Sequence, residues 1–127
     1  MSGAGNHESA DARATAATLS ALRAYRSAFD GWLAAPLQPD SYAATNATLA
    51  RLEEVAVCET AAVRDHVRQL RAIQRELIQV VLEAALATAE AAPARIAARG
   101  RLFGLHATSL GSLALACGLA QQRRSRA

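Results

Sequence analysis

The stretch 41–92 contains neither glycine nor proline, and this constrains the fold more than any other feature of the sequence. Glycine and proline are the residues that most readily end a helix. Pro36 and Pro39 precede the stretch and Pro93 follows it. One continuous helix over these residues would be about 75 Å long at 1.5 Å per residue. The sequence therefore predicts one long central helix over about 41–92, with a break near residues 57–62 as the alternative.

Apolar residues recur through this stretch with heptad spacing. With Leu49 at position a, the two seam positions a and d are apolar except at Thr45, Glu59 and His66. The a positions are Tyr42, Leu49, Ala56, Val63, Leu70, Leu77 and Ala84, and the d positions are Thr45, Leu52, Glu59, His66, Ile73, Val80 and Ala87. Val67 and Val81 at position e widen the stripe. A stripe of this width favours a helical bundle over a two-stranded coiled coil.

The remaining segments are also predicted to be helical. Alanine, the best helix former, supplies 33 of the 127 residues, and the low aromatic content of 4% argues against a β-sandwich. Before the central stretch, one helix face carries Leu19, Leu22, Tyr25, Phe29, Trp32 and Leu33. After it comes a segment rich in Ala, Leu and Gly. The expected fold is an all-α bundle of three or four helices, with a glycine-notched C-terminal helix.

The ends of the chain differ in composition from its middle. Residues 1–8 are glycine-rich and polar, which predicts a flexible tail. Residues 121–127 are polar and basic and predict a second flexible tail. A single helical domain is expected over residues 9–120.

All 14 basic residues are arginine, and the net charge is only +3. The absence of lysine is typical of a GC-rich bacterial genome. The two cysteines, Cys58 and Cys117, lack metal-ligand spacing and are expected to be free buried thiols in a reducing cytosol. Residues 1–18 have no early apolar run and do not resemble a secretory signal peptide. We therefore expect a cytoplasmic protein.

Four arginines of the central stretch form a candidate site. Arg64, Arg68, Arg71 and Arg75 follow one another at steps of four, three and four, which places them on one helix face opposite the apolar stripe. The interpretation without a function is an ordinary solvent-exposed helix face, and the functional interpretation is a docking strip for an anionic partner. An acidic protein is the favoured anionic partner. Nucleic acid is less favoured, because net charge and interleaved aromatic residues are low.

The two charged or titratable residues of the seam, Glu59 and His66, lie one heptad apart. A buried carboxylate destabilises a protein unless it is paired. We expect a polar layer or a locally open seam, and in a dimer His66 of one helix could meet Glu59 of another. No Glu-x-x-His motif accompanies them, so neither a metal site nor a cofactor is expected.

Residues 102–120 contain no formally charged side chain and are flanked by arginines on both sides. As a helix they would span about 28 Å, close to the thickness of a bilayer core. Gly104, Gly111 and Gly118 recur every seven residues and predict a smooth face against which another helix backbone packs closely. With Leu105 and Leu115, they form the expected partner-binding face. A buried bundle helix is the favoured interpretation of the segment as a whole, and a C-terminal membrane anchor, which would make the protein membrane-associated, is the remaining alternative.

The string Arg-Leu-Phe-Gly-Leu-His, from Arg101 to His106, resembles the Arg-x4-6-His motif of HEPN-domain ribonucleases. Arg99 satisfies the longer spacing of that motif. The resemblance covers six to eight residues and implies an RNA-cleaving dimer. In such a dimer His106 would serve as general acid or base and Arg101 would stabilise phosphate.

No other catalytic motif is present. The chain lacks a Gly-x-Ser-x-Gly sequence, a P-loop and a Cys-x-x-Cys pair. The sequence therefore favours a non-enzymatic helical adaptor, chaperone or regulator. We expect it to bind a protein partner by helix packing and to form a homodimer. The ribonuclease and the membrane anchor remain the alternatives.

Overall fold

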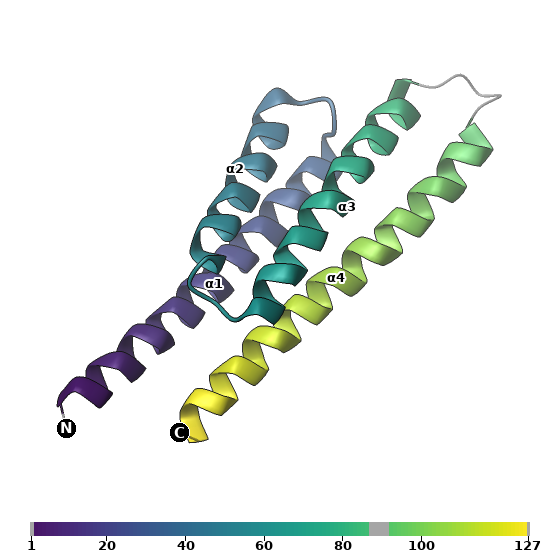
Figure 1. Cartoon of the computed structure of the whole chain (residues 1–127). Helices are drawn as coiled ribbons and strands as arrows, with labels where there is room; N and C mark the ends of the chain where they lie inside the picture. The colour runs from purple at the N-terminus through teal and green to yellow at the C-terminus, as the bar shows by residue number, and fades with distance from the viewer. Residues whose placement is uncertain (1, 87–91, 127) are drawn as a thin grey trace.

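The computed structural model describes residues 2–86 and 92–126, and these residues form four helices without any strand. The helices are α1 (Ser2–Ala34), α2 (Pro39–Ala56), α3 (Ala61–Leu86) and α4 (Ala92–Arg126). They run alternately up and down, so that the two ends of the chain lie at the same end of the bundle (Figure 1). The predicted all-α helical bundle is confirmed.

The prediction of one long central helix over residues 41–92 was wrong, and the alternative break near 57–62 is confirmed. α2 ends at Ala56 and α3 begins at Ala61. Thr60 caps α3, because the backbone N–H of Val63 donates to its hydroxyl (3.3 Å) and that of Arg64 donates to its carbonyl (3.0 Å). The chain reverses here without glycine or proline. The reversal lets the apolar stripes of both halves face one core, which a single 75 Å helix could not do.

The heptad pattern also shifts across this turn. In α2 the buried residues are Thr45, Leu49, Leu52 and Ala56, which are the predicted a and d positions. In α3 the buried residues occupy positions a and e instead, namely Val63, Val67, Leu70, Gln74, Leu77 and Val81. The predicted d positions His66, Ile73 and Val80 are only half-buried. The seam was therefore not continuous, because α3 is rotated relative to the register of α2.

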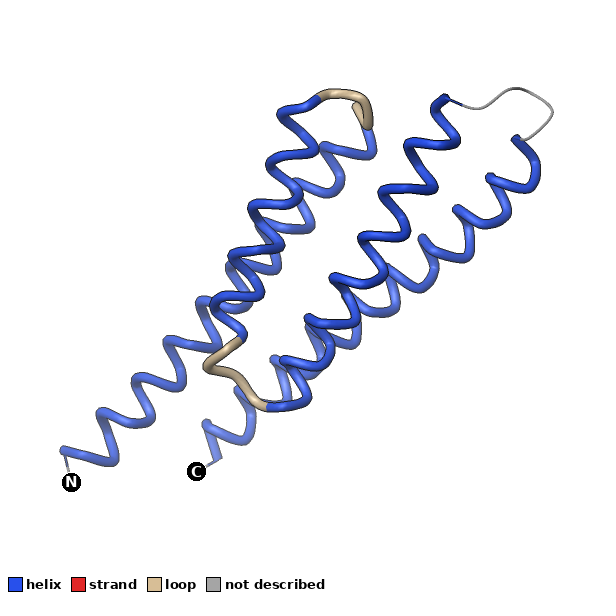
Figure 2. Tube along the Cα trace, turned by 45° about the horizontal axis from the view of Figure 1, so that its top comes forward, coloured by secondary structure: helices blue, strands red, loops and turns tan. Residues whose placement is uncertain are grey.

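The bundle consists of two helical hairpins. α1 packs on α2, α3 packs on α4, and α1 also packs on α4 (Figure 2). The predicted face of the first helix is confirmed, because Leu22, Tyr25, Phe29 and Trp32 are buried in the core. On the opposite side, α2 and α3 are in contact and line two cavities of about 210 and 190 Å³. The hairpins are therefore joined both through α1 and α4 and, beside these cavities, through hydrogen bonds from Arg71 to Glu53 and from Gln74 to Asn46.

Polar contacts fix the turn between α1 and α2. The indole N–H of Trp32 donates to the carbonyl of Pro36 at 3.2 Å, and the hydroxyl of Ser41 donates to the carbonyl of Ala35 at 2.8 Å. Pro39 occupies the first turn of α2, where its missing N–H has no helical partner to lose.

The backbone is helical from Ser2 and as far as Arg126, although the sequence predicts tails over 1–8 and 121–127. The division of the chain into tails and a 9–120 domain stays a prediction. Cys117 is buried as expected, whereas Cys58 is exposed in the turn between α2 and α3. The prediction of a buried thiol was therefore wrong for Cys58.

We expect Leu70→Ala to lower the free energy of unfolding by about 2–5 kcal/mol, because it leaves a cavity at a fully buried position. Leu37→Ala is the matched control, since Leu37 is 60% exposed and its truncation removes little packing. Urea denaturation followed by circular dichroism measures both. Equal midpoints for the two variants would contradict the described core.

Candidate protein-interaction surface

One face of α4 forms part of the bundle core. His106, Ser109, Leu113 and Cys117 follow one another at steps of three and four, and all four are buried. The prediction that this segment is a buried bundle helix therefore describes one face of α4 only.

The opposite face of α4 is solvent-exposed and carries no charge between residues 104 and 119. We call it the outer face of α4. It consists of half-buried Gly118 and of seven exposed residues, Gly104, Leu105, Ala107, Thr108, Gly111, Leu115 and Leu119. Leu115 is 65% exposed and Leu105 is 54% exposed. The solvent face of a helix in a soluble bundle normally carries charged and polar residues. An uncharged face of this length is typical of a surface that another structure covers.

The three glycines of the outer face have open space beside them. A Cβ atom built at Gly104, Gly111 or Gly118 meets no atom within 4 Å outside its own stretch of helix. The sequence predicts that another backbone packs closely here, and nothing within the described chain does so. Any close approach must therefore come from outside the chain.

The charges of α4 all lie near its two ends. The helix contains six arginines and no acidic residue. Arg101 is exposed, and the guanidinium of Arg99 lies 5.1 Å from the centre of the Phe103 ring. The apolar middle of the helix is thus bounded by positive charge on both sides.

A cavity of about 300 Å³ lies beside the outer face, between α3 and α4. Thr60, Ala62 and His66 line it from one side, and Ser112, Leu115, Ala116 and Leu119 line it from α4. The Nδ1 atom of His66 is buried and has no hydrogen-bond partner among the described residues. This polar atom could not be located from the sequence, because it depends on how α3 is rotated against α4.

The structure separates Glu59 from His66, the predicted polar layer. Glu59 lies in the turn before α3 and is buried, and its Oε1 atom accepts a hydrogen bond from the hydroxyl of Thr18 on α1 at 3.0 Å. His66 instead faces the cavity beside α4. Their meeting across a dimer stays a prediction.

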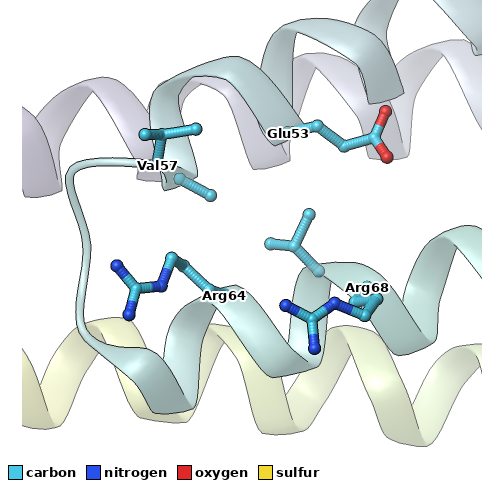
Figure 3. Close-up of a pocket in the computed structure, with 6 residues that line it drawn as sticks. Glu53, Val57, Arg64 and Arg68 are labelled. Carbon is cyan, nitrogen blue, oxygen red and sulfur yellow. The ribbon is translucent and has the colours of Figure 1, made fainter.

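The predicted arginine strip lies along α3 beside α2, at the edge of the cavity shown in Figure 3. Arg64, Arg68 and Arg75 are exposed. Arg71 is half-buried and forms a two-pronged ion pair with Glu53 of α2, with 3.1 Å between Nε and Oε2. The hydrogen bond to Glu53 raises the pKa of Arg71, and the partial burial of the guanidinium opposes this shift only in part. Arg68 pairs with Asp65 at 3.3 Å. Part of the strip is therefore already neutralised, and its docking role stays a prediction.

Within one chain, Arg101 and His106 lie on different sides of α4, and their meeting across a dimer stays a prediction. His106 is only 2% exposed, and its Nε2 lies 2.7 Å from the hydroxyl oxygen of Tyr25. Its ring stacks on Phe29 with 4.0 Å between the centroids. Arg101 is exposed five residues earlier, which places it about 140° around the helix from His106.

Burial controls the protonation of this core cluster. It lowers the pKa of His106 from 6.5 to about 4, and the nearby charge of Asp30 opposes that shift only in part. Burial also raises the pKa of Tyr25 above its usual value of 10. The phenol therefore keeps its proton and can donate it to the neutral imidazole. The hydrogen bond to Tyr25 and the stacking on Phe29 thus join His106 of α4 to α1.

Acid should destabilise the protein through His106. The unfolded chain binds a proton at this residue below about pH 6.5, whereas the folded chain binds it only below about pH 4. Stability should thus fall as the pH drops from 6.5 to 4, by roughly 3 kcal/mol in total. His106→Gln keeps a hydrogen-bonding group without titrating, and its unfolding free energy should fall less over this range. Identical pH profiles for the two proteins would contradict the assignment.

The segment Arg99–Leu119 of α4 is long and apolar enough to cross a membrane, judged by length and composition alone. In the bundle, 22% of its apolar window is buried. No group of three or more His, Cys, Asp or Glu side chains that could hold a metal ion occurs within the described ranges.

We compared the chain with protein-family models, curated proteins and solved structures. No family model matches the chain, and no curated protein or solved structure matches it either. The fold and surface define the chain only as an all-α helical bundle with an uncovered apolar helix face.

Proposed function

We propose that this protein is a non-enzymatic helical interaction module, an adaptor, chaperone or regulator. It binds a protein partner by helix packing on the outer face of α4 and self-associates through this face. The observation that carries the proposal is the uncharged outer face, with exposed Leu105 and Leu115 and three glycines at which an added Cβ atom would meet nothing within 4 Å. Such a face loses water-exposed apolar area when another helix covers it.

A catalytic role has less support from the geometry. The titratable residue of the ribonuclease resemblance, His106, is buried against Tyr25 and Phe29 and serves the core. A membrane-spanning role for α4 would remove this contact and the burial of Leu113 and Cys117. Packing on the outer face needs no such rearrangement, since its residues other than Gly118 are already exposed.

Substituting Leu115→Glu should abolish self-association, because it buries a carboxylate in the middle of an apolar contact. Leu37→Glu introduces the same charge at a similarly exposed leucine in the α1–α2 turn and should leave association unchanged. Light scattering on gel-filtered protein, over a range of concentrations, measures the mass of each variant. We expect a dimer for the wild type and for Leu37→Glu, and a monomer for Leu115→Glu.

A second measurement separates self-association from membrane binding. Wild-type protein is mixed with vesicles of phosphatidylcholine and phosphatidylglycerol and then sedimented. We expect the protein to stay in the supernatant. A wild-type protein that is monomeric at all concentrations, or that sediments with the vesicles, would overturn the proposal.

A further inference from the structure

We infer that the groove between α2 and α3 is a second binding site, which takes an extended acidic peptide segment of a partner protein. This site does not depend on the proposed self-association, because none of the residues that line it belongs to the outer face of α4. Three features of the groove point to this ligand, namely cavities in line along it, arginines that are unpaired within the described chain, and a buried amide oxygen.

Three cavities of about 210, 190 and 240 Å³ follow one another along the groove. The residues that line them from α3 run from Arg64 to Leu82, and all of them fall within about 120° of the helix circumference. From α2, Val57 lines the first cavity, Asn46 the second, and Tyr42 both the second and the third. Arg64 and Leu82 are 18 residues apart, so the groove is about 27 Å long.

Positive charge lines the first two cavities. Arg64 and Arg68 lie on the α3 side of the first cavity (Figure 3), and Arg71 and Arg75 line the second. Neither Arg64 nor Arg75 forms an ion pair within the part of the chain that the structure describes. Arg68 pairs with Asp65, but both side chains are more than half exposed, so the pair is weak. Three guanidinium groups are thus available to carboxylates from outside the chain.

The centre of the groove is neutral, because Arg71 is held there by Glu53 of α2. The two arginines without an ion pair, Arg64 and Arg75, lie to either side of this centre, 11 residues or about 16 Å apart. Two carboxylates about five residues apart on an extended peptide match this spacing. A nucleic-acid backbone carries a phosphate on every nucleotide, and those at the centre would find no free cation. The distribution of charge therefore favours an acidic peptide over nucleic acid.

Gln74 forms part of the wall of the second cavity and is 1% exposed. Its Nε2 donates to Oδ1 of Asn46 at 3.2 Å, whereas its Oε1 is buried and has no hydrogen-bond partner among the described residues. A buried acceptor without a partner destabilises the folded chain. A peptide in the cavity brings both an N–H donor and a carbonyl acceptor, so it satisfies this amide whichever way the two amides are oriented.

This contact also favours an extended peptide. The N–H groups within a helix are already bonded to carbonyls of the same helix, whereas those of an extended segment are free to donate. A phosphate group without a proton offers no donor at all. The buried oxygen thus agrees with the charges in favouring a peptide.

The end of the groove beyond Tyr42 is apolar. Pro36, Pro39 and Leu82 line the third cavity together with Tyr42, which is 41% exposed. An apolar side chain that enters this cavity loses contact with water. A groove of about 27 Å accommodates about eight residues of extended peptide. The expected segment is acidic along the arginines and apolar at the Tyr42 end.

A peptide library tests the site on the 127-residue chain. Fluorescent peptides of about eight residues carry two glutamates four to six positions apart, with alanine, valine, leucine or glycine in every combination elsewhere. A matched set carries lysine in place of glutamate. We expect binding to members of the glutamate set and to none of the lysine set, with affinity that falls as the salt concentration rises. Absence of binding to every glutamate peptide would overturn the inference.

Substituting Arg64→Gln and Arg75→Gln together should weaken binding of the tightest peptide about tenfold or more, because two charge-assisted hydrogen bonds are lost. Both side chains are exposed and unpaired within the described chain, so the fold does not depend on them. The matched control is Arg51→Gln with Arg101→Gln, which removes the same charge from exposed positions outside the groove. Equal losses in the two double variants would show attraction to net charge alone and overturn the inference.

Gln74→Met tests whether the peptide enters the groove, because it removes the buried amide and keeps the length of the side chain. We expect binding to weaken about tenfold, while circular dichroism shows that the protein stays helical. Unchanged binding in this variant would place the peptide on the exposed arginines outside the groove, which would contradict the proposed site.

The two proposals fail separately. A dimer by light scattering that binds no glutamate peptide would overturn the inference and leave the proposed function standing. A monomeric wild type that binds these peptides would do the reverse. Leu115→Glu on α4 should bind them as tightly as the wild type does. Binding of labelled oligouridine in place of every glutamate peptide would assign the groove to RNA and overturn the inference.

Discussion

The contact of His106 with Tyr25 and Phe29 is the interaction on which the rest of the bundle depends. The two hairpins meet along α2 and α3, where two cavities flank the Arg71–Glu53 ion pair and the hydrogen bond from Gln74 to Asn46, and also along α1 and α4. At that interface a neutral imidazole stacks on one ring and shares a hydrogen bond with the hydroxyl of another. Because the imidazole is buried and neutral, the contact needs no counter-charge. The contact also fixes the rotation of α4 about its axis. Because His106 faces the core, the residues on the opposite side of the helix face the solvent.

The outward orientation of the apolar glycine face follows from this constraint. His106, Leu113 and Cys117 are buried, and Gly104, Gly111 and Leu115 lie on the opposite side of the same helix. A single rotation of α4 thus determines both its core and its exposed surface. The cavity beside His66 arises in the same way, because Ser112 and Ala116 are too small to fill the space toward α3.

Much of the fold could be predicted from the sequence, and the failures have physical reasons. The apolar steps of three and four in residues 19–33 placed the first helix correctly, and the C-terminal segment was helical as expected. The break at residues 57–60 was given only as an alternative. In the sequence, only the capping residue Thr60 marks this break. The heptad spacing continues across it, because apolar residues and alanine are so frequent in this chain that they also fall on seam positions by chance. For the candidate surface, the sequence predicted the glycine face but not its exposure. Exposure depends on the rotation that the contacts of His106 impose, and those contacts join residues 81 apart in the chain.

The glycines themselves give the remaining argument that α4 acts on something outside the chain. Glycine within a helix costs about 1 kcal/mol relative to alanine, because the unfolded chain loses more conformational freedom on folding. At Gly104, Gly111 and Gly118 the bundle leaves room for a Cβ atom, so packing within the chain does not require glycine at any of them. Three such residues at heptad spacing weaken the longest helix of the bundle with no gain inside it. Under the function proposed above, the gain arises where a second helix approaches the backbone of α4 more closely than a side chain would permit. The glycines thereby lower the free energy of unfolding of the isolated chain. Under the proposed function, the packing of another helix on the same face offsets this loss.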